Sequence, residues 1–378
     1  MALPLASVID LLEEIAPLEH AEAWDNVGLL LEPASDRRDP AAPPSVARVL
    51  ATIDLTDAVV AEALASDVDL IVSYHPPWFQ PLKRLSARRP GERVLLAAAR
   101  AGIAIYSPHT ALDAAKGGVN DWLADALGAS ERTPLVPGSR PAKLMIVVFV
   151  PKEHVDALRS AMASAGAGEI GAYRECSYAL EGEGTFLGDE STNPSVGERG
   201  RLERVPETRL EMVCARKHLT KVTRAIQRVH PYEEPAWDVY ALEQKPEIYV
   251  GMGRSVTLAE PQTLETLTER VKRHLGLETL RLATPDGPPS PIRRVAVCAG
   301  SGASLFEKAE PHDLYLTGEL RHHDVLALLS RGRSVMLCEH SSSERGFLPA
   351  FAERLSELAG GELAVSVSSA DREPIRRV

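Results

Sequence analysis

Three strand-like apolar runs of the chain each end in a histidine, namely His75, His109 and His340. A carboxylate follows two of them after four residues: Asp113 follows His109, and Glu344 follows His340. Ligands of open α/β sheets bind at the carboxyl ends of strands, so the three histidines are expected to converge on one pocket. Imidazole nitrogens and carboxylate oxygens are the donors that suit Zn, Fe or Mn. The pattern therefore predicts a metal site.

Each of these residues also has an ordinary structural alternative. His75 precedes two prolines, which favour a stiff, extended backbone, and a histidine there can simply bond a neighbouring backbone group. Asp113 can cap a helix, and Glu344 can lie in the first turn of a helix that follows a serine N-cap. Three strand-end histidines with two carboxylates at matching offsets favour the metal site over these separate explanations.

Two further motifs follow strands in the second half of the chain. His322 and His323 are neighbours, and neighbouring residues of a helix diverge by about 100°, so both are not expected to bind one ion. We predict His323 as a proton shuttle that lines the pocket; exposure of both rings is the alternative. The turn Gly300-Ser301-Gly302 is predicted to receive a phosphate on free N–H groups. A tight strand-to-helix turn is the alternative there.

The serines after His340 suggest a serine nucleophile only weakly. A histidine that binds a metal cannot also act as the base for a neighbouring serine, so Ser341, Ser342 and Ser343 are not predicted to be catalytic.

Composition excludes several classes of function. The chain has 378 residues, of which 44% are hydrophobic and 25% charged, as in an ordinary soluble protein. The net charge of −11 gives no basic surface for nucleic acid or for an anionic membrane. Neither a signal peptide nor an apolar run of membrane-spanning length is apparent, and the four cysteines are scattered. These features predict a cytoplasmic protein with reduced thiols that acts on a small molecule.

The pattern of elements predicts an α/β protein with an insert. Strands and helices alternate on both sides of a central segment, which indicates two similar α/β halves with mostly parallel sheets. The central segment has the order strand, helix, strands, helix, strand, which is ferredoxin-like, with short strands expected in the Gly-rich stretch 166–200. The predicted domains are residues 1–140 and 245–378 for the two halves of the metal-binding domain, and residues 141–244 for the α+β insert.

Six short motifs are distributed along nearly the whole chain. They are Trp24-Asp25-Asn26-Val27-Gly28-Leu29-Leu30, Ser73-Tyr74-His75-Pro76-Pro77, His109-Thr110-Ala111-Leu112-Asp113, Gly300-Ser301-Gly302, Thr317-Gly318-Glu319, and Cys338-Glu339-His340 through Glu344. In these motifs and in their order the chain resembles the Nif-three-like dinuclear metal-centre family, whose bacterial members are described as homologues of GTP cyclohydrolase I type 2. The segment His230-Pro231-Tyr232-Glu233-Glu234-Pro235 resembles the PII/CutA-like domain inserted in longer members.

The resemblance implies two divalent ions between the halves. Their ligands would fall on Tyr74, His75, Asp113, His340 and Glu344. Most bacterial members have a histidine where this chain has Tyr74, and a phenol with a pKa of about 10 must lose a proton to bind well. One of the two ions (Zn, Fe or Mn) is therefore expected to be weakly held or absent. The resemblance also implies a homohexamer built as a trimer of dimers.

These observations together predict a function. We expect a divalent-metal-dependent hydrolase, similar to GTP cyclohydrolase I type 2, that acts on a nucleotide-like substrate through metal-activated water. His109 or His323 would move protons. The alternative is a metal-binding regulatory or interaction module without turnover. In the insert, His230 with its neighbouring glutamates is interpreted as an ordered turn rather than a second metal site.

Overall fold

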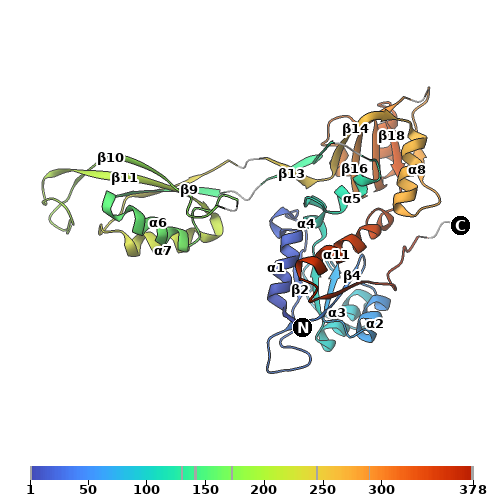
Figure 1. Cartoon of the computed structure of the whole chain (residues 1–378), viewed down its shortest axis with the longest axis horizontal. Helices are drawn as coiled ribbons and strands as arrows, with labels where there is room; N and C mark the ends of the chain where they lie inside the picture. Colours follow the sequence, from blue (N-terminus) through green and yellow to red (C-terminus); the bar gives the residue numbers. More distant parts are fainter. Residues whose placement is uncertain are drawn as a thin grey trace. The chain divides into compact units, whose positions relative to one another are not determined.

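The computed structural model describes residues 2–128, 131–139, 143–171, 173–243, 246–288 and 290–375. The chain divides into two compact units, residues 1–139 with 246–378, and residues 140–245 (Figure 1). The predicted domain boundaries, after residues 140 and 244, fall on positions outside the described residues.

The first sheet of the larger unit has five strands. β19, β4, β5 and β6 run parallel to one another, and β2 runs antiparallel to β6. The residues of β5 and β6 are buried along their whole length, as expected for strands covered on both faces. In spatial order the strands are β19 (Ala364–Val367), β4 (Arg48–Thr52), β5 (Leu70–Ser73), β6 (Ala104–Ser107) and β2 (Gly28–Leu31).

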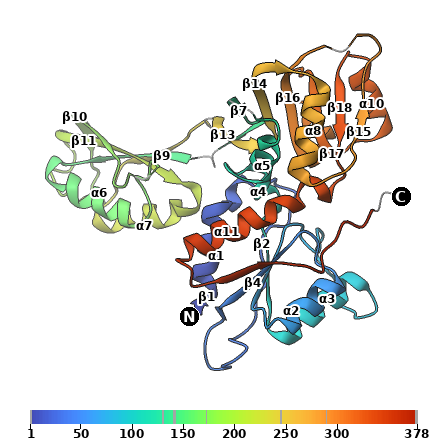
Figure 2. The same cartoon turned by 45° about the vertical axis from the view of Figure 1, so that its right-hand side comes forward.

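Helices cover both faces of this sheet (Figure 2). α2 (Asp57–Ala65) and α3 (Pro90–Ala101) pack on one face, where Leu50, Ile71 and Ile105 of the strands meet apolar residues of both helices. α1 (Leu5–Ile15) and α11 (Leu348–Leu358) contribute to the core on the other face. The two short helices that follow β6 are α4 (His109–Ala114) and α5 (Val119–Asp125).

The second sheet of this unit is mixed. β16, β17 and β18 run parallel, whereas β15, β14 and β7 join antiparallel. In spatial order they are β15 (Arg281–Ala283), β18 (Ser334–Leu337), β17 (Leu314–Glu319), β16 (Ile292–Ser301), β14 (Arg254–Gln262) and β7 (Glu131–Thr133). α8 (Leu264–Leu275) covers one face, and α9 (Ala303–Phe306) and α10 (His322–Leu329) cover the other.

The two halves exchange edge strands. β19 comes from the end of the chain and pairs with β4 of the first sheet, and β7 comes from the first half and pairs with β14 of the second. One buried cluster contains residues of both sheets, including Val72 and Leu316. Neither exchanged strand is among the predicted elements, because both are short and neither has a fully buried residue.

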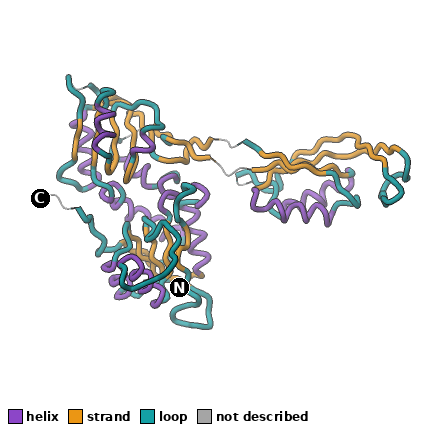
Figure 3. Tube along the Cα trace, turned by 180° about the vertical axis from the view of Figure 1, so that it is seen from behind, coloured by secondary structure: helices purple, strands orange, loops and turns teal. Residues whose placement is uncertain are grey.

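The smaller unit has the predicted ferredoxin-like order. Its antiparallel sheet has the spatial order β10-β11-β9-β12, and the two helices join one face of that sheet in a shared core (Figure 3). The Gly-rich stretch differs from expectation, since it contributes one long strand paired along its full length rather than several short ones. The elements are β9 (Lys143–Val150), α6 (Val155–Ser164), β10 (Tyr178–Leu187), β11 (Leu202–Ala215), α7 (Leu219–Val229) and β12 (Trp237–Ala241).

Four further strands complete the larger unit. β8 and β13 form a two-stranded ribbon whose strands directly flank the smaller unit in sequence, and β1 pairs with β3 near the N-terminus. Their bounds are β8 (Val136–Ser139), β13 (Pro246–Met252), β1 (Leu3–Pro4) and β3 (Ser45–Val46). The fold is therefore the predicted α/β protein interrupted by an α+β unit.

Candidate metal centre

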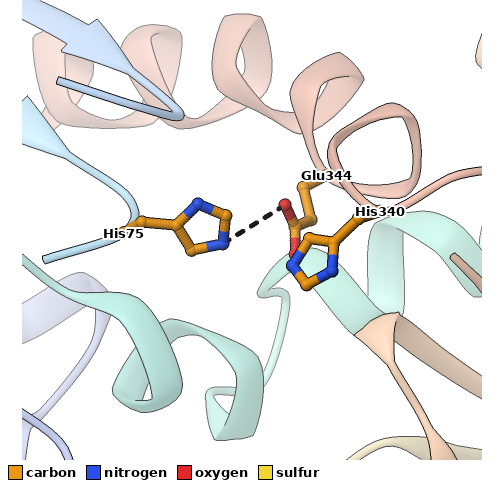
Figure 4. A group of neighbouring side chains, drawn as sticks. All are labelled: His75, His340 and Glu344. Carbon is orange, nitrogen blue, oxygen red and sulfur yellow. Dashed lines mark ion pairs between the residues drawn. The ribbon is translucent and has the colours of Figure 1, made fainter. Parts of the chain in front are cut away.

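Three of the predicted ligands meet in the larger unit. His75 follows β5 of the first sheet, and His340 and Glu344 follow β18 of the second. One potential ligand atom of each residue lies within 4.8 Å of the corresponding atoms of the other two. Figure 4 shows both imidazole rings directed towards the two oxygens of the Glu344 carboxylate. A group of two imidazoles and one carboxylate could hold a divalent metal ion.

Glu344 is the buried centre of this group, with only 3% of its side chain exposed. Its Oε2 lies 3.5 Å from Nε2 of His75, and its Oε1 lies 3.4 Å from Nε2 of His340. Among the described residues, Oε2 has no hydrogen-bond partner. A buried carboxylate oxygen without a donor is costly in water-free surroundings. A cation between the two rings would satisfy it, so the residues present fit a metal ion.

A second carboxylate orients each of the two histidines in this group. Nδ1 of His75 lies 3.0 Å from Asp54, and Nδ1 of His340 lies 3.1 Å from Glu319. Metal-binding histidines commonly donate their other ring N–H to a carboxylate, which fixes the ring and increases its basicity. In both residues this leaves Nε2 as the ligand atom, and Nε2 is the atom that faces Glu344.

Asp54 and Glu319 were missed as site residues, although the sequence holds a signal for both. Asp54 lies two residues after the end of β4, and Glu319 is the last residue of β17. Like the histidines, they lie at the carboxyl ends of parallel strands. A single carboxylate after a strand is too common to be singled out by itself, so the signal becomes specific only through the pairing with a histidine.

The carboxylates around His75 raise its pKa. Burial alone would lower the pKa of His75, but its hydrogen bond to Asp54 and the negative charges of Glu344 and Asp54 outweigh burial and raise the pKa to about 10. The hydrogen bond from His75 in turn lowers the pKa of Asp54. In the absence of an ion, His75 is therefore an imidazolium held between two carboxylates, and a metal ion would take the place of its proton.

Tyr74 and Asp113 bind each other rather than joining the three-residue group. Tyr74 is buried, and its hydroxyl donates to the Asp113 carboxylate. Burial, with the negative charge of Asp113, raises the pKa of the Tyr74 hydroxyl well above its ordinary value. Burial also raises the pKa of Asp113 to about 6, against the opposing effects of His109 and Tyr74. Tyr74 is thus a neutral phenol, and its oxygen is not prepared to bind a cation.

His109 stands beside this group with its ring fixed by a buried carboxylate. Its Nδ1 lies 2.8 Å from Asp25, and Asp25 also accepts from the backbone N–H of Thr110 at 3.1 Å. The His109 and His75 rings have centroids 5.3 Å apart. The backbone of His109 has a φ of +23°, a strained conformation for a residue other than glycine. Fixed strain of this kind indicates that the position of the ring is enforced by its surroundings.

The backbone of Gly300 packs directly against the side chains of Glu344 and His340. The backbone N–H of Gly300 donates to Oγ of Ser343 at 2.8 Å, so it is not free for a phosphate, contrary to its predicted role. Gly300 has a φ of +63°, and a Cβ there would lie 2.6 Å from Oε1 of Glu344 and 3.1 Å from Nε2 of His340. Only glycine lets these two ligands lie against the backbone. Phosphate binding at Ser301 and Gly302 stays a prediction.

We expect Gly300→Ala to weaken metal binding by about 10- to 100-fold. The new methyl group would collide with the side chains of Glu344 and His340 and move their ligand atoms away from the positions that a metal ion requires. Gly276→Ala is the matched control, since Gly276 has a nearly equal φ of +65° and open space around its Cβ position. Isothermal titration with Zn²⁺ or Mn²⁺ measures the difference. Equal affinities in the two variants would contradict this role of Gly300.

The remaining sequence candidates are not members of the three-residue group found among the described residues. His322 and His323 are exposed in the first turn of α10, with ring centroids 5.4 Å apart. The hydroxyls of Ser341 and Ser342 donate to Glu373. In the insert, His230 is held by the Phe149 carbonyl and the Tyr232 N–H, as expected for an ordered turn.

No helix in the described part of the chain is long and apolar enough to cross a membrane.

Comparison with known proteins places these features in a family context. The model of the family described as Duf34/NIF3 (NGG1p interacting factor 3) matches residues 4–374. The chain is 37% identical over 375 residues to the NIF3-like protein 1 of Bos taurus, which covers 98% of this chain and 92% of that protein. It is 36% identical over 318 residues to a GTP cyclohydrolase 1 type 2 homolog of Bacillus subtilis, covering 84% of this chain and 82% of that protein.

A solved structure supports the same relationship. The crystal structure of a Bacillus cereus protein related to NIF3 superposes with a TM-score of 0.74 at 31% sequence identity, and it covers 99% of this chain and 98% of that one. The resemblance inferred from the six sequence motifs is confirmed.

Proposed function

Because the chain belongs to the Duf34/NIF3 family, we propose that it is a divalent-metal-dependent hydrolase that acts on a nucleotide-like substrate. The proposed activity resembles that of GTP cyclohydrolase 1 type 2, for which the Bacillus subtilis relative is named as a homolog. The observation that supports this proposal best is the His75, His340 and Glu344 group, whose buried carboxylate oxygen lacks a donor among the described residues. A divalent ion there would supply Lewis-acid chemistry, which increases the acidity of water and polarises the attacked centre.

The residues of the chain have separate roles in this proposal. His75, His340 and Glu344 hold the ion, and Asp54 and Glu319 orient the two imidazoles through their Nδ1 atoms. The geometry supports one ion at this group. A second ion stays a proposal, because Asp113, its predicted ligand, is engaged by the Tyr74 hydroxyl.

His109 is the proposed proton carrier. Asp25 holds its Nδ1–H, which leaves the lone pair of Nε2 to accept a proton from water or to return it to the leaving atom. This pairing of a buried carboxylate with an imidazole fixes the tautomer that a general base requires. His323 is left out of the proposal because its ring is exposed in the first turn of α10.

A panel of nucleotides incubated with metal-loaded protein tests the hydrolase. We expect turnover of at least one purine nucleotide, with a loss of about 100-fold or more in His109→Ala, whose general-base contribution is typically of that size. His322→Ala is the control, because that ring is exposed in α10. Metal binding without turnover of any nucleotide would contradict the hydrolase and favour the alternative, a metal-binding regulatory or interaction module.

Replacing Tyr74 with histidine is expected to raise the number of bound ions. The neutral phenol of Tyr74 donates to Asp113, whereas an imidazole at this position offers a lone pair and releases the Asp113 carboxylate. Elemental analysis of protein purified without added metal should show well under two ions per chain in the wild type and more in Tyr74→His. Tyr74→Phe controls for the loss of the hydrogen bond alone. Two fully occupied ions in the wild type would contradict this prediction.

The assembly is proposed by resemblance and stays a prediction. A homohexamer, built as a trimer of dimers, would have a mass of six times the 40.9 kDa chain. Light scattering of the full-length protein measures this mass directly. A monomeric or dimeric mass at micromolar concentration would contradict the hexamer.

A further inference from the structure

Two large aromatic side chains are exposed beside the metal group. Trp24 is 61% exposed and Phe79 is 45% exposed. Their ring centroids lie 6.3 Å apart with an angle of 35° between the planes. Each also contacts the ring of His109, at 6.1 Å from Trp24 and 5.7 Å from Phe79. Since His109 contacts His75 in turn, the two exposed rings are one residue removed from the ligands of the metal group.

The loops that carry these rings are held in place by partly buried polar contacts. Asp25, next to Trp24, is fixed by His109 and Thr110. The Asn26 side chain donates to the carbonyl of Trp78 at 2.7 Å, which links the loop of Trp24 to that of Phe79. In the Trp24-Asp25-Asn26 motif, the second and third residues therefore have structural partners. The first residue presents a large apolar ring to solvent, although its neighbours fix its backbone.

We propose that Trp24 and Phe79 form a stacking platform that binds the planar heteroaromatic ring of the substrate beside His109. This inference rests on the proposed function, because it names the part of a nucleotide-like substrate that the chain would recognise. Base–aromatic stacking contributes strongly and tolerates different bases, because every base has a π-face. Exposed apolar side chains held together beside polar catalytic groups are typical of a ligand site.

The chemistry of the surroundings favours a planar ring over an aliphatic ligand. The ring planes of Trp24 and Phe79 are tilted by 35° to each other, and both rings are exposed. His109 makes edge contacts with both rings, at 78° and 67°, and so places a polar, nitrogen-bearing ring beside the pair. A purine or pteridine-like ring stacked there would have its heteroatoms beside His109, and its substituents would be free to extend towards His75.

Binding to chelator-treated, full-length protein tests the platform without requiring a metal or turnover. Guanosine 5′-triphosphate and ribose 5-phosphate are the two probes, and their affinities are measured by isothermal titration and by tryptophan fluorescence. We expect Trp24→Ala and Phe79→Ala each to weaken binding of the purine nucleotide by about 5- to 150-fold. Trp24→Phe should retain most of the affinity. Ribose 5-phosphate should bind all variants equally.

Leu85→Ala is the matched control, because Leu85 is a 53% exposed apolar residue of the loop that follows Phe79. Equal purine affinity in the wild type and in both alanine variants would overturn the platform. An absence of purine binding would also overturn it. Burial of Trp24 on self-association alone would overturn it as well, because the two rings would then belong to an interface between copies of the chain. A platform that binds purines in a chain without hydrolysis would leave this inference standing and contradict only the proposed reaction.

Discussion

Glu344→Gln should remove almost all bound metal while the chain remains folded. The glutamine keeps the shape of the side chain, but it replaces one oxygen by an amide nitrogen that has no lone pair for a cation, and it removes the negative charge. Because Glu344 faces both His75 and His340, its loss affects both imidazole–carboxylate pairs of the group. We expect the affinity for Zn²⁺ or Mn²⁺ to fall by more than about 100-fold, beyond the usual effect of an orienting residue.

Elemental analysis, titration with metal and circular dichroism together measure this outcome. Glu353→Gln is the control, since Glu353 is an exposed glutamate of the neighbouring α11 and its replacement changes the net charge equally. Glu319→Gln provides a graded comparison, because Glu319 only orients His340, and a smaller loss of about 10- to 100-fold is expected. Full metal content in Glu344→Gln would mean that the ion is held by other residues.

The positions of the histidines could be predicted from the sequence because strand ends are recognisable. His75, His109 and His340 each follow a short buried strand, and parallel strands in α/β folds bring such ends to one edge. The convergence of these histidines was predicted from the strand ends, whereas only the family resemblance indicated that they would meet between the two halves. Local patterns contain no information on how two sheets face each other, since that arrangement depends on the shared core.

The hydrogen-bond partner of Asp113 could not be predicted from the spacing of Asp113 and His109. The helical i, i+4 offset from His109 is real, because α4 contains both residues. However, Asp113 is bound by the hydroxyl of Tyr74, which is distant in sequence. The competition between a phenol and a cation for one carboxylate is decided by burial and distance. In the same way, Gly300 has a function in ligand packing that the expected phosphate turn does not suggest.

The affinity for metal should increase steeply with pH, because His75 must lose a proton before it can bind. The pKa of His75 is about 10 in the metal-free protein, since its hydrogen bond to Asp54 and the negative charges of Glu344 and Asp54 overcome the opposing effect of burial. Below that pH, each bound ion displaces one proton from His75. The affinity should therefore rise about tenfold per pH unit between pH 7 and 9, or about 100-fold over this range.

The same pKa predicts an opposite trend for the stability of the metal-free chain. A folded-state pKa raised above the ordinary histidine value of 6.5 stabilises the fold fully below pH 6.5, and this contribution is lost as the pH rises through about 10. Urea unfolding of chelator-treated protein should show a decline of at most about 1.4 kcal/mol per pH unit in this window. The metal-loaded protein should lack the decline, because its His75 is already unprotonated.

Asp54→Asn separates this mechanism from a general effect of pH. Without the Asp54 carboxylate, the pKa of His75 should fall, so the rise of metal affinity should level off at a lower pH than in the wild type. Asp57→Asn is the matched control, because Asp57 pairs with Arg93 at an exposed position of α2. Calorimetry at pH 8 in buffers of different ionisation enthalpy counts the protons released. One proton per ion is expected in the wild type, and fewer in Asp54→Asn. No proton release in the wild type would mean that His75 is neutral before the ion binds, and the carboxylates around it would then bind the metal by charge alone.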